Sequence, residues 1–408
     1  MSIYFRYFVV LLFVLINGNP FLQQQVEAGI IILCICSLFL IRRDYIKQMQ
    51  NDQKSFLLIL FFISFELIHG LVFGLSNEKT IFRVFSYFFI SLVFSRLFVF
   101  DFIRIYVNLI IGLVLFSFIF YLCAYLTPNI YFYLNNLSAI VFPLRMNYAD
   151  YSTPTMILYT FDTGFISGEG DILRNPGFTW EAGGFAFFIN IAIFFELINT
   201  QAKSLFPFLT RKRSIILFLG LISTFSTAGF ISLFVLIFFY FVTYLNINNV
   251  ISSAVVLLLS ILLYYQLDFL SQKINDQLDI SDFSQNRFSA ALLDFDDFIR
   301  SPFIGWSRDL SVLFKTSVYT DFTHRPNGVT NFLRSYGFIY FLVYFVSLFS
   351  SLKIYFAHMG YRRAGRSSLI LILSIIIMGF AQQVIHIPFI MFLLFLGNSA
   401  RSLNSVYK

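Results

Sequence analysis

Residues 214–245 read SIILFLGLISTFSTAGFISLFVLIFFYFVTYL, and they decide how many times the chain crosses a membrane. The run is too long for one span of about 20 residues and short for two. Near its middle lie small hydroxyl residues and one glycine: Ser223, Thr224, Ser226, Thr227 and Gly229. Such residues favour a turn, so we expect two short helices that meet at a break.

The whole chain has the composition of a polytopic membrane protein. Of its 408 residues, 58% are hydrophobic and 12% are charged, and the mean hydropathy is +0.79. These values are typical of an all-α integral membrane protein. We expect one transmembrane domain over residues 1–408 with about 12 spans. The apolar runs that predict them are 4–17, 24–41, 55–75, 81–100, 102–126, 183–198, 214–226, 228–245, 251–269, 331–350, 368–384 and 387–399.

Basic residues between the apolar runs predict the orientation. Twelve spans place three basic clusters and both termini on the cytoplasmic side, as the positive-inside rule requires. A single span over 214–245 would put the second and third clusters on opposite sides. These basic residues between the apolar runs also account for the net charge of +7, so the charge does not indicate nucleic-acid binding. The clusters are Arg42, Arg43, Lys47 and Lys54; Lys203, Arg211, Lys212 and Arg213; and Lys353, Arg362, Arg363 and Arg366.

Two polar segments, 127–182 and 270–330, then become outward-facing loops on the same side of the membrane. The first loop holds Arg174 and Glu181, and the second holds His324 among many charged residues. A transporter would be expected to gather its polar groups at mid-membrane, on broken helices. Polar groups in two surface loops favour chemistry at the membrane surface instead.

Several motifs of soluble enzymes are absent from the sequence. There is no GxxxxGK[ST] phosphate loop, so nucleotide hydrolysis is not expected. There is no HExxH motif or paired Cys/His spacing, so we expect neither a metal nor a cofactor. Residues 294–297, DFDD, resemble the acidic triplet that holds a metal-bound nucleotide sugar in soluble glycosyltransferases. Apolar residues at helical spacing over 287–300 favour an amphipathic surface helix with a solvated acidic face.

Six segments with polar residues follow one another along the chain: RNPGFTWEAGGFA (174–186), LISTFSTAG (221–229), NRF (286–288), SPFIGW (301–306), HRPNG (324–328) and NFLRSYG (331–337). In this order they resemble the bacterial O-antigen polymerase and O-antigen ligase family. Its members typically show an arginine, a glycine and a Glu-Pro-type pair before a span, then a serine-rich break, then an outer loop with arginine, turn and His/Asn residues. Ala182 stands where a proline is common, and Thr227 stands where ligases usually carry an arginine, which favours polymerase.

The resemblance implies a metal-independent glycosyltransferase that polymerises oligosaccharide repeat units carried on undecaprenyl diphosphate. The lipid diphosphate is then both anchor and leaving group. An arginine fork neutralises a departing diphosphate better than the point charge of lysine. We expect Arg174 and Arg287 to bind it, supported by Arg83 and Arg325. The attacking sugar hydroxyl benefits from a general base, and we expect His324 to be that base.

Other polar residues receive weaker expectations. Glu181 is a candidate ion-pair partner of Arg174, and Asn327 is expected in a turn that aims His324. Glu66 and His69 lie inside one apolar run and favour a helix-packing pair, although ionisable residues within the membrane are often functional. His386 lies between the last two runs and is a second histidine that could face outward.

Two other functions stay open. The nearest is the O-antigen ligase, which transfers finished glycan to a lipid A core. The other, from a different class, is a flippase or transporter of lipid-linked oligosaccharide. As polymerase, the protein would reside in the bacterial inner membrane with its active site facing the periplasm. Its partners would be the lipid bilayer and undecaprenyl-diphosphate-linked oligosaccharide, together with chain-length regulator and flippase proteins, and no nucleic acid.

Overall fold

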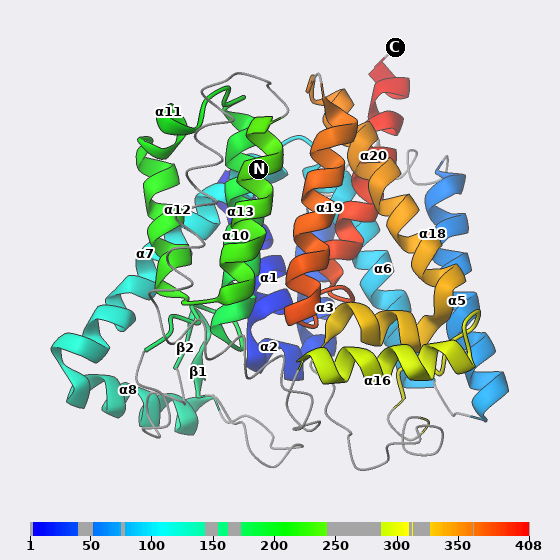
Figure 1. The fold of residues 1–408 in the computed structure, drawn as a ribbon, viewed down its shortest axis with the longest axis horizontal. Coiled ribbons are helices and arrows are strands. Elements are labelled where there is room, and N and C mark those ends of the chain that lie inside the picture. Colours follow the sequence, from blue (N-terminus) through cyan, green and yellow to red (C-terminus); the bar gives the residue numbers. More distant parts are fainter. Residues whose placement is uncertain are drawn as a thin grey trace. The chain divides into compact units, whose positions relative to one another are not determined.

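A computed structural model describes residues 3–39, 52–74, 78–142, 154–161, 173–242, 287–309, 312, 327–361 and 363–407. Helices dominate this part of the chain, and its sheet is one hairpin of two short strands (Figure 1). Six of the described helices are long and apolar enough to cross a membrane, and two apolar helices are shorter. The expectation of an all-α membrane protein with multiple spans is confirmed.

The chain divides into two compact units. Unit 1 comprises Met1–Leu40 and Phe100–Val250, and unit 2 comprises Ile41–Val99 and Ile251–Lys408. Unit 1 contains α1 (Ile3–Gly18), α2 (Pro20–Gln24), α3 (Val26–Leu38), α7 (Phe102–Leu126), α8 (Pro128–Val141), β1 (Thr155–Met156), β2 (Tyr159–Thr160), α10 (Ala182–Asn199), α11 (Leu205–Leu209), α12 (Lys212–Ser223) and α13 (Thr227–Val242). Unit 2 contains α5 (Gln53–Phe73), α6 (Glu78–Phe98), α16 (Arg287–Arg300), α18 (Gly328–His358), α19 (Ala364–Ala381) and α20 (Pro388–Tyr407).

Helix α10 is the core of unit 1. Every residue from Ala182 to Ile198 is buried, because α7, α12 and α13 pack around the helix. Small residues permit this close packing. A Cβ atom on Gly229 of α13 would lie 2.7 Å from the Cβ of Ala186 on α10. The glycine therefore lets the two helices approach.

The break expected within 214–245 is present. Helix α12 ends at Ser223 and α13 begins at Thr227. Hydroxyl groups replace the interrupted backbone bonds: Thr224 Oγ1 donates to the carbonyl of Leu221 at 2.7 Å, and the N–H of Gly229 donates to Ser226 Oγ at 3.2 Å. The serines and threonines thus cap the ends of both helices.

Unit 2 is a helix bundle with a polar layer at one end. Helix α20 packs against α18 and α6, and α18 also packs against α19. With 31 residues, α18 would be about 46 Å long if straight, which exceeds a hydrocarbon core of about 30 Å. It bends at Gly337, where the backbone is not helical. The segment before the bend lies beside α16, and the rest runs along the bundle (Figure 1).

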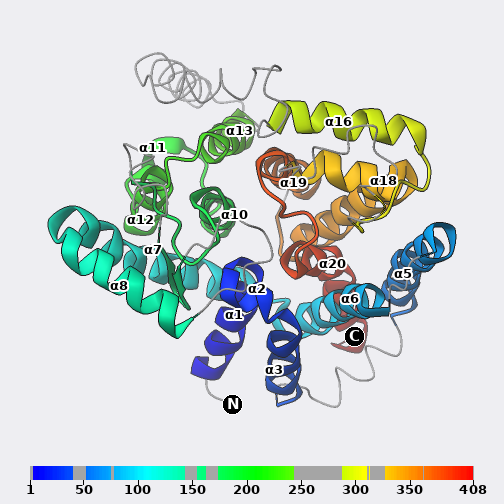
Figure 2. The same ribbon diagram turned by 90° about the horizontal axis from the view of Figure 1, so that it is seen from below.

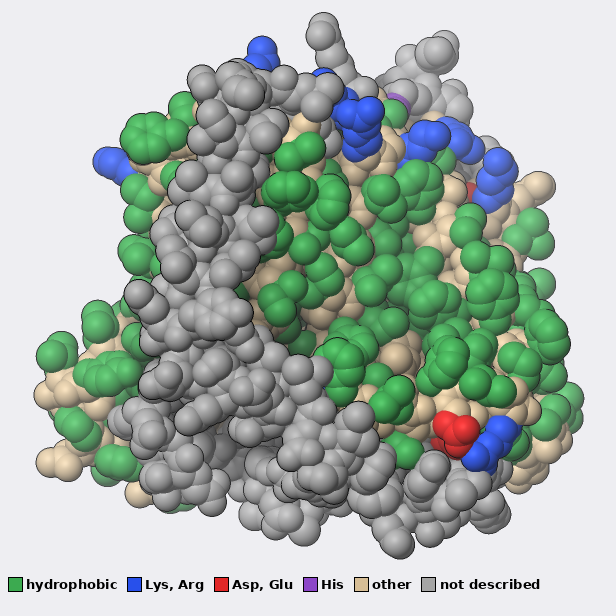
Figure 3. Space-filling model, in the orientation of Figure 1, with side chains coloured by type: hydrophobic (Ala, Val, Ile, Leu, Met, Phe, Trp, Pro, Cys, Tyr) green, Lys and Arg blue, Asp and Glu red, His purple; other side chains and the backbone are tan. Residues whose placement is uncertain are grey.

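The two ends of unit 2 differ in charge. Helix α18 ends and α19 begins at the end that carries Arg363 and Arg366, and Figure 3 shows basic side chains gathered there. At this end Arg96 of α6 forms a buried ion pair with Asp52. Helix α16 and the start of α18 lie at the opposite end (Figure 1). The polar residues described next belong to that end.

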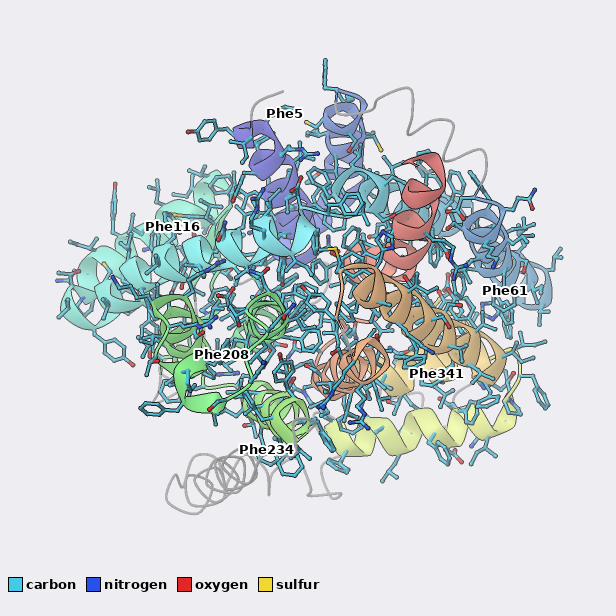
Figure 4. The ribbon with its side chains drawn as sticks, turned by 90° about the horizontal axis from the view of Figure 1, so that it is seen from above. Phe5, Phe61, Phe116, Phe208, Phe234 and Phe341 are labelled. Atoms are coloured by element: carbon cyan, nitrogen blue, oxygen red, sulfur yellow. The ribbon has the colours of Figure 1, made fainter. Side chains whose placement is uncertain are left out.

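Aromatic side chains fill the bundle of unit 2. The rings of Phe62 on α5 and Phe88 on α6 stack with their centroids 4.9 Å apart. Phe61 on α5 and Phe341 on α18, both labelled in Figure 4, join the same cluster through Tyr340 and Phe332. Such pairs add about 0.5–1.5 kcal/mol each beyond the area they bury. These phenylalanines therefore pack the interior of unit 2.

Candidate functional site

Glu66 and Tyr336 form the centre of a buried polar group in unit 2. Helix α5 turns Ile59, Phe62 and Glu66 to the same inward face, because these residues are three to four positions apart. The carboxylate of Glu66 accepts a hydrogen bond of 2.5 Å from the Tyr336 hydroxyl of α18. A carboxylate inside an apolar helix is costly unless it is paired, and Tyr336 supplies the partner.

Arg308 adds a positive charge to this group. It lies in the segment that follows α16, and its guanidinium interacts with Tyr336, Glu66 and Tyr87 of α6. The side chain keeps solvent-accessible surface, although the surrounding protein removes part of its water. This burial alone would lower the pKa of Arg308, but Tyr336 and Glu66 outweigh it and raise the pKa. Arg308 is therefore a fixed cation that solvent can reach.

His386 lies on the other side of Tyr336. It belongs to the connection between α19 and α20, and its ring centroid is 5.0 Å from that of Tyr336 and 4.5 Å from that of Phe332. Burial and the charge of Arg308 lower the pKa of His386 well below 6.5. The imidazole is therefore neutral near pH 7, and burial and Arg308 both oppose its protonation.

Glu66 and His69 both pack α5 against other parts of unit 2, as the sequence suggested, but each binds a partner of its own. Nε2 of His69 donates to the carbonyl of Ile304 at 2.9 Å, so the proton is on Nε2. Two buried acceptors, Oε2 of Glu66 and Nδ1 of His69, have no hydrogen-bond partner among the described residues. Both atoms can accept a further hydrogen bond.

Backbone hydrogen bonds to α18 hold the segment that precedes Arg308. Residues 302–307 pair with the bend of α18: the N–H of Phe338 donates to the carbonyl of Pro302 at 2.7 Å, and the N–H of Ser307 donates to the carbonyl of Ser335 at 2.9 Å. A third bond of 3.0 Å runs from the N–H of Trp306 to the carbonyl of Arg334. The bend therefore exchanges helical bonds for bonds to the loop.

A second polar network joins α16 to the start of α18. Asp294 accepts a 2.8 Å hydrogen bond from Thr330 Oγ1, and its other oxygen lies 3.8 Å from Nε of Arg334. The expectation of an amphipathic helix over 287–300 is confirmed, but the expectation of a solvated acidic face is wrong for Asp294 and Asp297. Both are buried against the protein, whereas Asp296 is half-exposed and pairs with Arg300. The carboxylate of Asp294 faces polar partners on α18, and the backbone carbonyl of Asp297 accepts a 2.7 Å hydrogen bond from Nε1 of Trp306 in the following loop.

In unit 1 the structure brings two of the polar sequence segments together. The side-chain amide of Asn175 donates to Ser223 Oγ and to Ser117 Oγ, both at 2.9 Å. Nε of Arg174 donates to the carbonyl of Thr224 at 3.4 Å. The segment before α10 therefore packs on the break between α12 and α13, and Arg174 lies at that break.

The residues expected to bind substrate fall in both units. Arg174 is half-buried, and Glu181 is half-buried directly before α10 in unit 1. In unit 2, Arg287 is the half-buried first residue of α16. His324 and Arg325 lie outside the described residues.

Arg83 and Asn327 are the other two residues expected to bind substrate. Arg83 is exposed on α6. Asn327 is not in a simple turn: its side-chain oxygen accepts from the N–H groups of Val329 and Thr330 and caps α18. This cap is worth about 1 kcal/mol to the helix. Asn327 therefore has a structural role that its place in the sequence did not indicate.

Within the described residues, no group of three or more His, Cys, Asp or Glu side chains is placed to hold a metal ion. No protein-family model and no curated protein matches the chain.

The sequence pointed to loops and gave little weight to the group around Tyr336. Glu66 was visible as a carboxylate inside an apolar run, and such residues are functional candidates by default. Arg308 was one of many charged residues in the second loop, and His386 was a histidine between two apolar runs. Together they combine a fixed cation, a neutral imidazole and a carboxylate. The cation of this set can bind an anion.

Proposed function

We propose that the protein is a glycosyltransferase that polymerises oligosaccharide repeat units carried on undecaprenyl diphosphate at the outer face of the bacterial inner membrane. The observation that carries the proposal is Arg308: a solvent-accessible guanidinium beside Tyr336 and Glu66, in a unit of apolar helices. A lipid-linked diphosphate has the matching chemistry, because its charge lies at the membrane surface and its chain lies in the bilayer. The order of polar motifs in the sequence supports the same substrate.

In the proposed reaction, a hydroxyl of the acceptor sugar attacks the anomeric carbon of the donor. The bond between that carbon and the phosphate oxygen breaks, and undecaprenyl diphosphate leaves. His324 takes the proton of the hydroxyl. Arg308 neutralises the diphosphate through charge-assisted hydrogen bonds, each worth about 1.5–3 kcal/mol. Arg174 and Arg287 stay candidate diphosphate-binding residues on the grounds of the sequence. Arg83, Arg325, Glu181 and Asn327 have supporting roles at the substrate, and no metal takes part.

The proposal includes the topology. Twelve spans place the loops 127–182 and 270–330 outside and both termini inside. In unit 2 the basic residues at the junction of α18 and α19 support this orientation, because they lie at the end opposite to α16. A chain-length regulator and a flippase are the proposed protein partners.

The test is polymerisation of lipid-linked repeat units by the purified full chain in lipid vesicles, without added divalent metal. The wild type is expected to produce a ladder of products. Arg308→Ala is expected to lower the rate about 10–100-fold, and Arg308→Lys to restore a small part of it, because lysine lacks the fork. His324→Ala is expected to lower the rate by two to four orders of magnitude. Arg401→Ala is the control, since Arg401 is exposed on α20.

Failure would take one of several forms. An absolute need for a divalent cation, or near-normal rates for all three variants, would contradict the proposed mechanism.

A deletion strain separates the alternatives: loss of surface glycan above one repeat unit means polymerase, and free lipid-linked polymer means ligase. Repeat units that accumulate on the cytoplasmic face mean flippase, the alternative that the buried carboxylate of Glu66 favours.

A further inference from the structure

Helix α16 presents its apolar side outward and its acidic side inward. Four large side chains, three or four positions apart, form one exposed stripe: Phe288 is 47% exposed, Leu292 53%, Phe295 51% and Ile299 59%. On the opposite side, Asp294 is 0% and Asp297 3% exposed. A helix that covers a protein in water has the reverse arrangement. The surroundings of the stripe are therefore apolar.

The stripe continues beyond the helix. Phe303 and Ile304 of the following loop are exposed, and the N–H of Phe338 binds the carbonyl of the adjacent Pro302. From Phe338 onward, α18 exposes Ile339 and Leu342. Exposed apolar side chains therefore follow the chain from α16 through the loop to α18, which packs beside α16.

The orientation of α16 also differs from that of the spans. It lies across the direction of α18 and α19 (Figure 1) and at the periphery of its unit (Figure 2). The ion pair between Arg300 and Asp296 is at the border of the stripe, with an N···O distance of 2.5 Å. Hydrophobic side chains cover most of the described surface on the face drawn in Figure 3. An apolar stripe with a charged border, parallel to the membrane surface, matches an interfacial helix.

We propose that α16 is an interfacial membrane helix, whose stripe of Phe288, Leu292, Phe295 and Ile299 inserts into the acyl chains at the surface of the bilayer. The occupant of the stripe is lipid, because the stripe is continuous with the exposed surface of α18. The buried side keeps its own partners, since Asp294 binds Thr330 and lies near Arg334. The inference does not depend on the proposed enzymatic activity.

Spin labels test the proposal in the full chain. Cys34, Cys36 and Cys123 are replaced by alanine, and single cysteines are introduced by Leu292→Cys, Phe295→Cys and Asp296→Cys. The labelled proteins are reconstituted in vesicles of phosphatidylcholine and phosphatidylglycerol. Power saturation then compares collisions with oxygen, which concentrates in acyl chains, and with a water-soluble nickel chelate. Asp296 is the matched control, because it is adjacent to Phe295 but at the charged border.

The expected result is that oxygen dominates at positions 292 and 295 and that the nickel chelate dominates at position 296. Access of the chelate to 292 and 295 would mean that the stripe faces water, and it would overturn the proposal. Low collision rates for both reagents at these positions would mean that protein covers the stripe, either a second copy or another segment, and would also overturn it. If one variant fails to reconstitute, Ile299→Cys replaces it on the same stripe.

Discussion

Gly305 and Gly337 bring two backbone segments into direct contact. Both have positive φ angles, 77° and 72°. A Cβ atom on Gly305 would lie 2.6 Å from the backbone nitrogen of Gly337, and a Cβ atom on Gly337 would lie 2.5 Å from the carbonyl of Phe303. The loop that positions Arg308 therefore depends on two glycines that are 32 positions apart in the sequence.

Gly337→Ala is expected to destabilise the protein much more than Gly360→Ala. Both positions have positive φ, which costs an alanine about 1–2 kcal/mol. Gly360, however, has no atom within 4 Å of an added Cβ, whereas Gly337 meets backbone atoms. Thermal unfolding of the purified variants in detergent measures the difference. Equal losses would mean that the close approach of loop and helix does not contribute to stability.

Tyr336→Phe is expected to lower the free energy of unfolding by about 1.5–3 kcal/mol, because it removes a hydrogen bond to a carboxylate. Tyr344→Phe is the matched control. The Tyr344 hydroxyl donates to the carbonyl of Ile385 at 2.8 Å, a neutral bond worth about 0.5–1.5 kcal/mol. The same unfolding assay compares the two variants. If they lose the same stability, the bond from Tyr336 to Glu66 contributes no more than a neutral hydrogen bond.

Acid is expected to destabilise the wild type partly through His386. The pKa of this residue is lowered well below 6.5 in the folded protein, so the unfolded chain binds the proton more readily. The contribution of neutral His386 to the free energy of unfolding is fully present above pH 6.5. It is lost as the pH falls from 6.5 towards the pKa of His386 in the folded protein.

His386→Gln removes this contribution. Its melting temperature is expected to fall less than that of the wild type between pH 7 and pH 5. Parallel curves for the two proteins would show that His386 does not titrate differently on folding.

Cysteine labelling is expected to place both loops outside. Single cysteines at Ser167 and Ser317, in a chain without native cysteines, should react with an impermeant maleimide in intact spheroplasts. Ser367 is buried at the start of α19, so the inner-side control is the exposed neighbour Arg366, and Arg366→Cys should react only after lysis. Labelling of one loop alone would be incompatible with twelve spans.

Local sequence patterns predicted the helices well and the polar contacts poorly. The break at 223–227 was predictable because hydroxyl residues beside a glycine cap helices locally. The bond between Glu66 and Tyr336 joins residues 270 positions apart, and no periodicity reports such a contact. The expectation that the acidic side of α16 faces water was wrong for a different reason. A helical pattern shows that the two sides of a helix differ, but not which side faces protein when the surroundings are lipid.

The bend at Gly337 has a consequence for biogenesis. Residues after the bend, 338–358, are about 31 Å long as a helix, enough to be released sideways into the bilayer as one segment. The carbonyls of Arg334 and Ser335 and the N–H of Phe338 find their partners in residues 302–307, and leaving such groups without partners in lipid costs several kcal/mol each. Residues 302–307 are translated before α18, so they stay at the membrane surface without these partners until α18 has been inserted. The hydrogen bonds at the polar end of unit 2 therefore form after insertion, when residues 302–307 bind to α18.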